Sequence, residues 1–225
     1  MTQGFRNPFA ELQGVPGVYT GGRSLLTINA APGQNVYGEI LLEFGGVQYR
    51  SWDPHRSKLA AMILQGARDI GLDSKSKALY LGAASGTTAS HVSDMLSDGF
   101  VYCVEIAQRS FRDLVKICER RKNMIPIMAD ANRPDTYAHE IEGVEFVYQD
   151  IAQRNQADIF VKNMFAFEAE HGILMVKSRC IDVNRDPKDV FAEVRRHLTA
   201  KNLTVKQVVD IDQYSKDHAA FIVEA

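Results

Sequence analysis

The length, composition and charge of the chain limit what it can be. Its 225 residues, 45% hydrophobic and 24% charged, are typical of a globular protein with one large core or with a main domain and a small appendage. No apolar run approaches the roughly 20 residues of a membrane helix. The net charge of −2 gives no overall cationic surplus, so an RNA substrate would require a local basic patch or the help of partners.

The first 52 residues differ from the rest and predict a small β-rich subdomain. Glycines punctuate this segment, and residues 36–44 and 47–50 flank Gly45 and Gly46 as in a hairpin. A helix is then expected, with Asp53 as its N-cap and Pro54 at its first position. We therefore predict two domains, 1–52 and 53–225.

From residue 78 onward, predicted strands and helices alternate. The strands are 78–82, 100–105, 125–128, 144–148 and 173–178, and the helices are 87–97, 108–122, 153–171 and 187–199. Two final strands, 203–209 and 218–223, have no helix between them and should be antiparallel. This order predicts an α/β fold with a Rossmann-like, doubly wound, mostly parallel sheet, which binds ligands at the carboxyl ends of its strands.

The small residues after the strand at 78–82 predict a nucleoside site. Gly82 and Gly86 permit a tight turn, and the Thr87 hydroxyl could cap the next helix, whose first N–H groups near Thr87 and Thr88 could hold a carboxylate. Glu105 ends the following strand, where a carboxylate can accept hydrogen bonds from ribose hydroxyls. Because the Gly-x-x-x-Gly spacing lacks the pyrophosphate fingerprint, it favours S-adenosylmethionine over NAD. A strand-turn-helix without a ligand is the alternative.

Polar side chains also follow the other predicted strands. Asp130, Asp150 and Lys177 come directly after or at the end of apolar runs. One such acid can be a helix cap, but four polar groups including Glu105 at one sheet edge indicate a site. Asp130 could accept from an adenine amino group. A lysine beside a carboxylate could orient a hydroxyl for methyl transfer.

The cysteines and the start of the chain bear on its compartment. Cys103, Cys118 and Cys180 are odd in number and widely spaced, and the first residues lack the apolar core of a signal peptide. We therefore expect a cytoplasmic protein without a disulfide framework, a metal site or a membrane anchor.

Longer segments resemble the archaeal fibrillarin family. They follow that family's order over nearly the whole chain and cover residues 49–61, 80–94, 121–131, 148–153, 177–182 and 216–219. The resemblance implies a methyltransferase that uses S-adenosylmethionine to modify the 2′-hydroxyl of RNA ribose. It would be the catalytic subunit of a C/D box guide-RNA particle acting on rRNA and tRNA.

The resemblance also implies roles for individual residues. The catalytic set would be Lys58, Asp150, Lys177 and His218, with Lys177 on the 2′-hydroxyl and Asp150 placing it, while Lys58 and His218 complete a polar rim. The cofactor contacts would be Gly82, Ala84, Thr87, Thr88, Glu105, Ile106, Asp130, Ala131, Asp150, Ile151, Ala152 and Gln153. Without the resemblance, Lys58 reads as a solvated helix residue and His218 as a structural histidine.

Partners would explain how a mildly acidic chain acts on RNA. In the fibrillarin family a Nop-family scaffold protein and a kink-turn-binding protein of ribosomal type hold the guide RNA. The basic runs 120–122 and 195–197 could touch the RNA backbone, although solvated helix faces are the simpler interpretation. Arg154, Ser178 and Cys180 depart from the family pattern beside the named positions. Other functions stay open on this fold: a small-molecule methyltransferase, a dehydrogenase, or a non-catalytic scaffold subunit that binds the cofactor.

Overall fold

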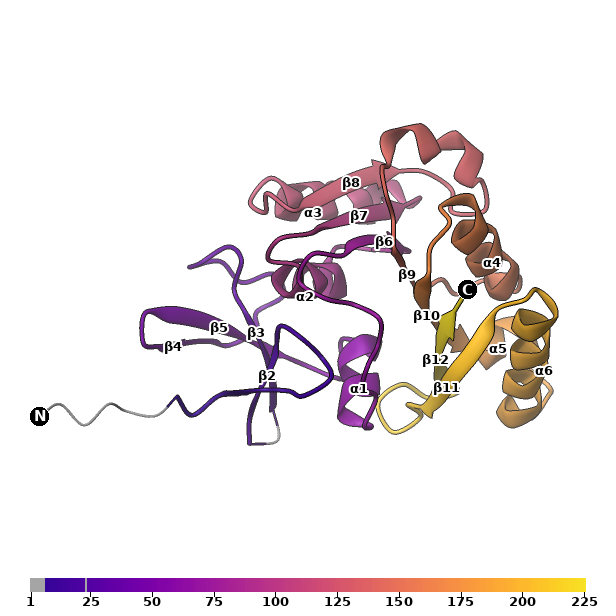
Figure 1. Ribbon diagram of the computed structural model, residues 1–225, viewed down its shortest axis with the longest axis horizontal. Helices are drawn as coiled ribbons and strands as arrows, with labels where there is room; N and C mark the ends of the chain where they lie inside the picture. Colours follow the sequence, from indigo (N-terminus) through magenta and orange to yellow (C-terminus); the bar gives the residue numbers. More distant parts are fainter. Residues whose placement is uncertain (1–6, 23) are drawn as a thin grey trace, which may run out of the picture.

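Two β-sheets organise the chain (Figure 1), and the computed structural model describes residues 7–22 and 24–225. The first sheet is antiparallel, with strand order β1-β2-β3-β5-β4. Its strands are β1 (Ala10–Glu11), β2 (Val18–Gly21), β3 (Ser24–Ile28), β4 (Leu41–Phe44) and β5 (Val47–Trp52). All of them fall within the predicted β-rich segment.

The second sheet has seven strands in the order β11-β12-β10-β9-β6-β7-β8. The run from β8 to β10 is parallel, and β12 and β11 add antiparallel pairs at one end. The strands are β6 (Lys77–Leu81), β7 (Phe100–Glu105), β8 (Met124–Met128), β9 (Phe146–Gln149), β10 (His171–Lys177), β11 (Thr204–Asp210) and β12 (His218–Glu224). The predicted fold class and the antiparallel final pair are confirmed.

Helices cover both faces of this sheet, as alternating side chains on its strands require. Ala78 and Tyr80 of β6 belong to one hydrophobic cluster, whereas Leu79 and Leu81 belong to the other. The first cluster includes residues of α1 (Lys58–Leu64), α2 (Thr87–Met95) and α3 (Gln108–Cys118), and the second includes residues of α4 (Gln156–Ala166) and α6 (Pro187–Ala200). The short α5 (Ser178–Ile181) and two 3₁₀ turns, Pro134–Thr136 and Ala138–Glu140, complete the helical segments.

The N-terminal sheet shares a core with the larger domain. Val18, Leu25 and Trp52 belong to the same cluster as Met95 of α2, and α2 contacts β3. The boundary after residue 52 remains a prediction, because a shared core does not show where two folding units divide. Among the described residues, no helix is long and apolar enough to cross a membrane.

One predicted helix start and one predicted helix cap are wrong, whereas the predicted start of α2 at Thr87 is correct. The first helix begins at Lys58 with Ser57 as N-cap, whose side chain accepts from the Ala60 N–H. Asp53 instead closes a turn, since its Oδ1 accepts from the His55 N–H at 2.8 Å. At α2 the N-cap is Gly86, and in the described structure no side chain, that of Thr87 included, caps this helix.

Two predicted element lengths are also wrong. The hairpin strand begins at Leu41 rather than at residue 36, because the Glu39 carboxylate accepts the N–H groups of Val36 and Tyr37 and holds them in a loop. The helix expected over 153–171 covers only Gln156–Ala166, since the preceding residues form the loop after β9 and His171 begins β10.

Candidate functional site

The loop between β6 and α2 is folded tightly against the ends of two neighbouring strands, β7 and β9. The N–H groups of Gly82 and Ala83 both donate to the Val104 carbonyl, at 3.0 and 3.1 Å. Gly82 has a φ of +79°, and a Cβ there would lie 2.6 Å from the Asp150 carbonyl oxygen. Only glycine fits this combination of a left-handed backbone and close approach.

Glu105 holds the loop from the neighbouring strand. Its two carboxylate oxygens accept from the N–H groups of Ala84 and Ala107, each at 2.7 Å. Ala84 has a φ of +49°, which is unfavourable for a residue with a side chain, and the hydrogen bond to Glu105 stabilises it. A carboxylate has about four lone-pair positions, so two remain for ligand hydroxyls.

A cavity of about 250 Å³ lies at the carboxyl ends of β6, β7, β8 and β9. Ten of the twelve predicted cofactor residues line it: Gly82, Ala84, Glu105, Ile106, Asp130, Ala131, Asp150, Ile151, Ala152 and Gln153. Asp130 accepts from the backbone and side-chain amides of Asn132, and that side chain also donates to Gln153 at 3.1 Å. This network fixes the polar rim of the cavity.

The chemistry of the lining fits S-adenosylmethionine. Glu105, Asp130 and Asp150 supply three carboxylates, and no lysine or arginine is among the described residues that line the cavity. Carboxylates suit ribose hydroxyls, an adenine amino group and a cationic sulfonium. A dinucleotide pyrophosphate requires donors and positive charge, which this cavity does not offer.

A polar cluster begins at Asp150, on the border of the cavity. The Lys58 ammonium donates to both of its oxygens, at 2.8 and 2.7 Å, and the two side chains are 26% and 24% exposed. Asp150 was expected to place Lys177, but the structure pairs it with Lys58. The pair is possible because α1 starts at Lys58 and turns that side chain toward the end of β9.

Lys177 and His218 complete the cluster from adjacent antiparallel strands. They are directly opposite partners in the β10–β12 register, so their side chains project from the same face. Burial lowers the pKa of His218, and the charges of Lys58 and Lys177 lower it further, whereas the Lys216 carbonyl and Asp150 act in the opposite direction. The structure therefore brings all four predicted catalytic residues together.

The hydrogen bonds of His218 determine its tautomer. Nδ1 lies 2.6 Å from the Lys216 carbonyl oxygen, which can only accept, so Nδ1 carries the proton. With its pKa lowered, the ring is neutral near pH 7 and Nε2 keeps a lone pair. The rings of Tyr80 in β6 and Tyr148 in β9 are both buried, with their centroids 4.5 Å apart, and Asp150 follows β9 two residues after Tyr148.

Comparison with known proteins identifies the family. Residues 9–225 match the family described as Fibrillarin. The chain belongs to this family. A fibrillarin-like rRNA/tRNA 2′-O-methyltransferase of Methanothermobacter thermautotrophicus is 46% identical over 216 residues, which cover 95% of this chain and 96% of the relative.

Solved fibrillarin structures have the same fold. Fibrillarin of Aeropyrum pernix, in complex with natively bound S-adenosyl-L-methionine, superposes with a TM-score of 0.85 at 39% identity, covering 96% of this chain and 97% of that one. A chain of a fibrillarin/Nop5p complex has a TM-score of 0.85 at 36% identity, covering 96% and 99%. The predicted family is thereby confirmed.

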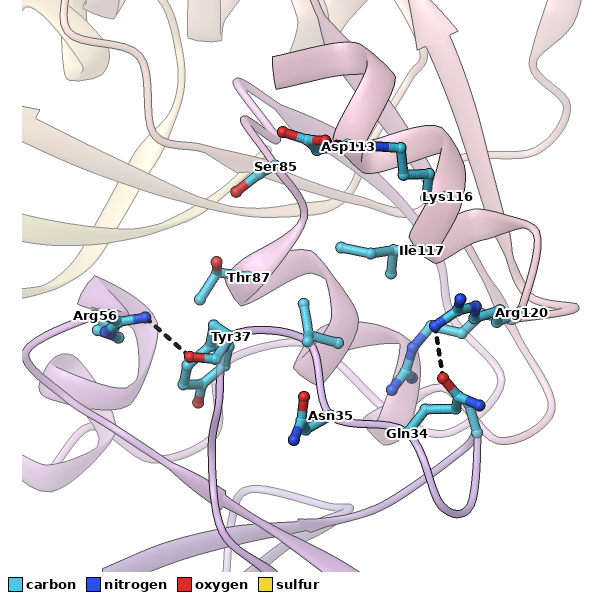
Figure 2. Close-up of a pocket in the computed structure, with 13 residues that line it drawn as sticks. Gln34, Asn35, Tyr37, Arg56, Ser85, Thr87, Asp113, Lys116, Ile117 and Arg120 are labelled. Carbon is cyan, nitrogen blue, oxygen red and sulfur yellow. Dashed lines mark hydrogen bonds and ion pairs between the residues drawn. The ribbon is translucent and has the colours of Figure 1, made fainter. Parts of the chain in front are cut away.

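Two of the predicted cofactor residues, Thr87 and Thr88, lie outside the cavity lining. The Thr88 hydroxyl donates to Ser57 at 3.1 Å and so joins α2 to the N-cap of α1. Thr87 lines a second cavity on the other side of the loop, beside Tyr37 and Ser85 (Figure 2). Their backbone N–H groups lie in the first turn of α2. That these groups hold the carboxylate of the cofactor remains a prediction.

Sequence reasoning missed three residues of the cofactor cavity: Val104, Ala129 and Asn132. Each is within two residues of a predicted contact, Glu105 or Asp130, at the end of a strand. Extending the predicted contacts by one or two residues along β7 and β8 would have included them, because a sheet edge presents consecutive backbone positions to the ligand.

Proposed function

We propose that this protein transfers a methyl group from S-adenosylmethionine to the 2′-hydroxyl of ribose in rRNA and tRNA. The observation that carries the proposal is the double role of Asp150. It lines the cofactor cavity and is also the anchor of the Lys58, Lys177 and His218 cluster. A methyl donor and a hydroxyl acceptor would therefore meet at this one residue.

The cavity would hold the adenosine part of the cofactor. Glu105 would accept from the ribose hydroxyls with its remaining lone pairs, and Asp130 would accept from the adenine amino group. Asp150, which also lines the cavity, would offset the positive charge of the sulfonium. When bound, S-adenosylmethionine supplies an electrophilic methyl group on a sulfonium centre.

The cluster would prepare the 2′-hydroxyl for attack. Lys177, which has no carboxylate partner among the described ion pairs, would donate to the 2′-oxygen and stabilise the negative charge that develops on it. The neutral His218 would accept the hydroxyl proton at Nε2. Lys58 would hold the Asp150 carboxylate in place through the two hydrogen bonds that it donates.

Guidance and binding of the RNA would come from partners. The solved fibrillarin/Nop5p complex supports a Nop-family scaffold protein as one of them. We further propose that a kink-turn-binding protein of ribosomal type and a C/D box guide RNA complete a cytoplasmic particle. The net charge of −2 is consistent with a catalytic subunit that is brought to its substrate.

Two measurements test this function. Calorimetry on the purified chain should detect S-adenosylmethionine binding, and NADH binding without S-adenosylmethionine binding would overturn the proposal. With guide RNA and both partner proteins, labelled methyl should appear on the ribose of the guided nucleotide, whereas the chain alone should methylate RNA poorly. A matched target with a single 2′-deoxy nucleotide at that position should accept no label; label on this target, or on a base, would contradict the proposed acceptor.

A further inference from the structure

A second cavity, of about 430 Å³, lies beside the loop that carries the cofactor site. Its walls come from four segments: the loop after β3, the turn before α1, the loop before α2, and the end of α3. We propose that this cavity binds the RNA strand that carries the acceptor nucleotide, holding a backbone phosphate between Arg56 and Arg120 and stacking a flanking base on Arg56. The proposal rests on the proposed function and identifies a surface on the protein for its substrate.

Positive charge in this cavity is only partly neutralised. Among its lining residues, Lys116 pairs with Asp113 at 2.8 Å, and the buried Arg121 pairs with Asp94 at 2.6 Å. Arg56 and Arg120 have no carboxylate partner among the ion pairs of the described residues. They come from opposite sides of the cavity, from the turn before α1 and from the end of α3 (Figure 2). Two unneutralised guanidiniums are a strong attraction for a phosphate.

Uncharged hydrogen-bond donors also line the cavity between the two arginines. Within the described structure the side chains of Asn35, Ser85 and Thr87 make no hydrogen bond, although all three line the cavity. Hydroxyl and amide groups of this kind make many of the contacts to phosphate and sugar oxygens in nucleic-acid complexes. The cavity therefore offers both charge and donors.

Arg56 also supplies a flat surface. Its guanidinium carbon lies 5.5 Å from the centroid of the Tyr37 ring, and it donates to the Tyr37 carbonyl at 3.2 Å. Unpaired RNA bases stack on aromatic rings and guanidinium planes of this kind. An acidic protein segment would use the charge but not this surface, which favours RNA as the occupant.

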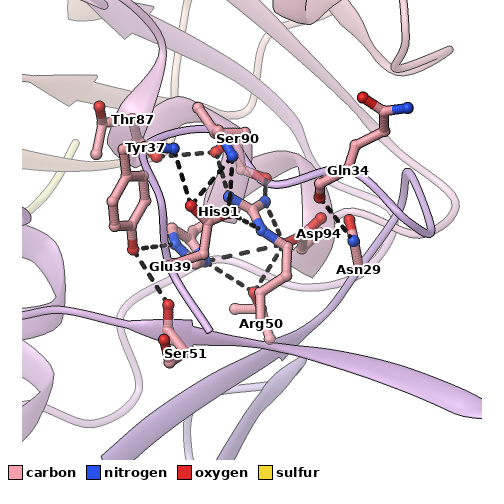
Figure 3. Close-up of polar contacts among 12 residues, drawn as sticks. Asn29, Gln34, Tyr37, Glu39, Arg50, Ser51, Thr87, Ser90, His91 and Asp94 are labelled. Atoms are coloured by element: carbon pink, nitrogen blue, oxygen red, sulfur yellow. Dashed lines mark hydrogen bonds and ion pairs between the residues drawn. The ribbon is translucent and has the colours of Figure 1, made fainter. Parts of the chain in front are cut away.

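The wall that carries Tyr37 is fixed in advance by buried contacts (Figure 3). Arg50 donates to Glu39 at 2.7 Å and to Asp94 at 2.8 Å, with its side chain fully buried. Glu39 accepts the Tyr37 N–H at 2.8 Å, and the Tyr37 hydroxyl lies 2.8 Å from Nε2 of His91 in α2. The loop after β3 is thus attached to α2, so the cavity needs little ordering when a ligand enters.

The position of the cavity suits the strand that carries the acceptor. Arg56 is two residues before Lys58, and Thr87 is one residue after the loop that borders the cofactor cavity. A strand with one phosphate at Arg56 would continue directly toward the Lys58–Asp150 pair. Its neighbouring nucleotide would then reach the catalytic cluster.

The test compares two double variants of the full chain. Arg56→Gln with Arg120→Gln removes both unneutralised charges of the cavity, whereas Arg195→Gln with Arg196→Gln removes two exposed charges from α6. The probe is a fluorescently labelled, single-stranded RNA of about 12 nucleotides, long enough to span one binding groove of this kind. Anisotropy titrations run from low to moderate salt.

We expect the cavity variant to bind this RNA about tenfold more weakly than the wild-type chain. Its slope of log affinity against log salt should fall by roughly 0.7, the contribution of the one single-strand phosphate contact that the two arginines share. The α6 variant should match the wild type. In the assembled particle, kcat/KM for the target RNA should fall by a similar factor, while calorimetry gives the wild-type S-adenosylmethionine affinity for both variants.

Three results would overturn the proposal: equal losses in the two variants, no RNA binding by the wild-type chain even at the lowest salt, or unchanged RNA affinity with weakened binding of the Nop-family scaffold. The last would make the cavity a protein interface. A chain that binds RNA here but neither binds S-adenosylmethionine nor transfers methyl would instead overturn the proposed function and leave this site standing.

Discussion

Replacing Gly82 by alanine should damage both the stability of the protein and its cofactor site. The added Cβ would lie 2.6 Å from the Asp150 carbonyl oxygen and 2.9 Å from Cγ1 of Ile151. A backbone oxygen cannot rotate away, so the chain must shift at Asp150. That residue borders the cofactor cavity and pairs with Lys58, and the shift therefore reaches the catalytic cluster.

The size of the effect follows from two separate costs. Gly82 has a φ of +79°, and a left-handed conformation costs a residue with a side chain about 1–2 kcal/mol. Crowding in a packed site adds about 1–3 kcal/mol. We therefore expect Gly82→Ala to lower the free energy of unfolding by about 2–5 kcal/mol, the sum of these two ranges.

Gly33 provides a matched control for the backbone cost alone. Its φ is +80°, and an added Cβ would meet no described atom within 4 Å. Gly33→Ala should therefore lose only the conformational part, about 1–2 kcal/mol. The difference between the two variants isolates the contact with Asp150.

Urea unfolding followed by circular dichroism measures the stability of both variants, and calorimetry measures their affinity for S-adenosylmethionine. We expect the affinity of Gly82→Ala to fall at least tenfold, and that of Gly33→Ala to match the wild type. Equal destabilisation by the two substitutions would refute the close-approach argument. Normal cofactor affinity in Gly82→Ala would refute the link from this glycine to the site.

Other substitutions test the cluster and the core. Lys177→Met should slow methyl transfer about 10²–10³-fold with cofactor affinity unchanged, measured with labelled cofactor in the assembled particle; wild-type turnover would remove Lys177 from the mechanism. Because burial and two lysines lower the pKa of His218, the acid limb of kcat/KM against pH should lie below the ordinary histidine value of about 6.5. In Lys58→Met the apparent pKa of this limb should rise, because the substitution removes a cation and leaves the Asp150 charge without its partner. An acid limb of the wild-type protein at or above about 6.5 would contradict the lowered pKa of His218. Asp94→Asn should lose about 3–5 kcal/mol, since it leaves the Arg121 guanidinium buried without its partner, and the fluorescence of the single tryptophan and circular dichroism should report the same transition.

The sheet and its ligand-binding edge could be predicted because their signals are local. Each central strand is a short apolar run, and Glu105, Asp130 and Asp150 follow such runs directly. In a parallel sheet the carboxyl ends of the strands meet at one edge. Positions far apart in the sequence therefore converge without any knowledge of side-chain packing.

Helix caps were predicted less well because several residues compete for the same role. Asp53 and Ser57 are both good N-caps, four residues apart. The structure uses Ser57, whose hydroxyl also accepts from Thr88 of α2. That contact joins segments 31 residues apart, so no local pattern could have selected it.

The Lys58–Asp150 pair also depends on a contact between distant segments, so no local pattern could have predicted it. Its members are 92 residues apart, and Lys58 is one of 26 lysines and arginines. Only the packing of α1 against the end of β9 distinguishes it from a solvated helix residue. The resemblance to fibrillarin placed Lys58 only in a polar rim and expected Asp150 to place Lys177, whereas the structure pairs Asp150 with Lys58.

The distribution of charge shows why the net value of −2 says little about RNA. The cofactor cavity carries three carboxylates, whereas the second cavity carries four cations and one acid, and the loop from Gly82 to Thr87 lies between them. A sulfonium requires the first environment and a phosphate requires the second, so neither sign could serve both. At physiological salt the Debye length is about 8 Å, which limits how far each field extends. The carboxylates on one side of the loop can therefore attract the cationic methyl donor, while the cations on the other side attract the anionic acceptor strand. Both can be brought to Asp150 by a chain whose total charge is close to zero.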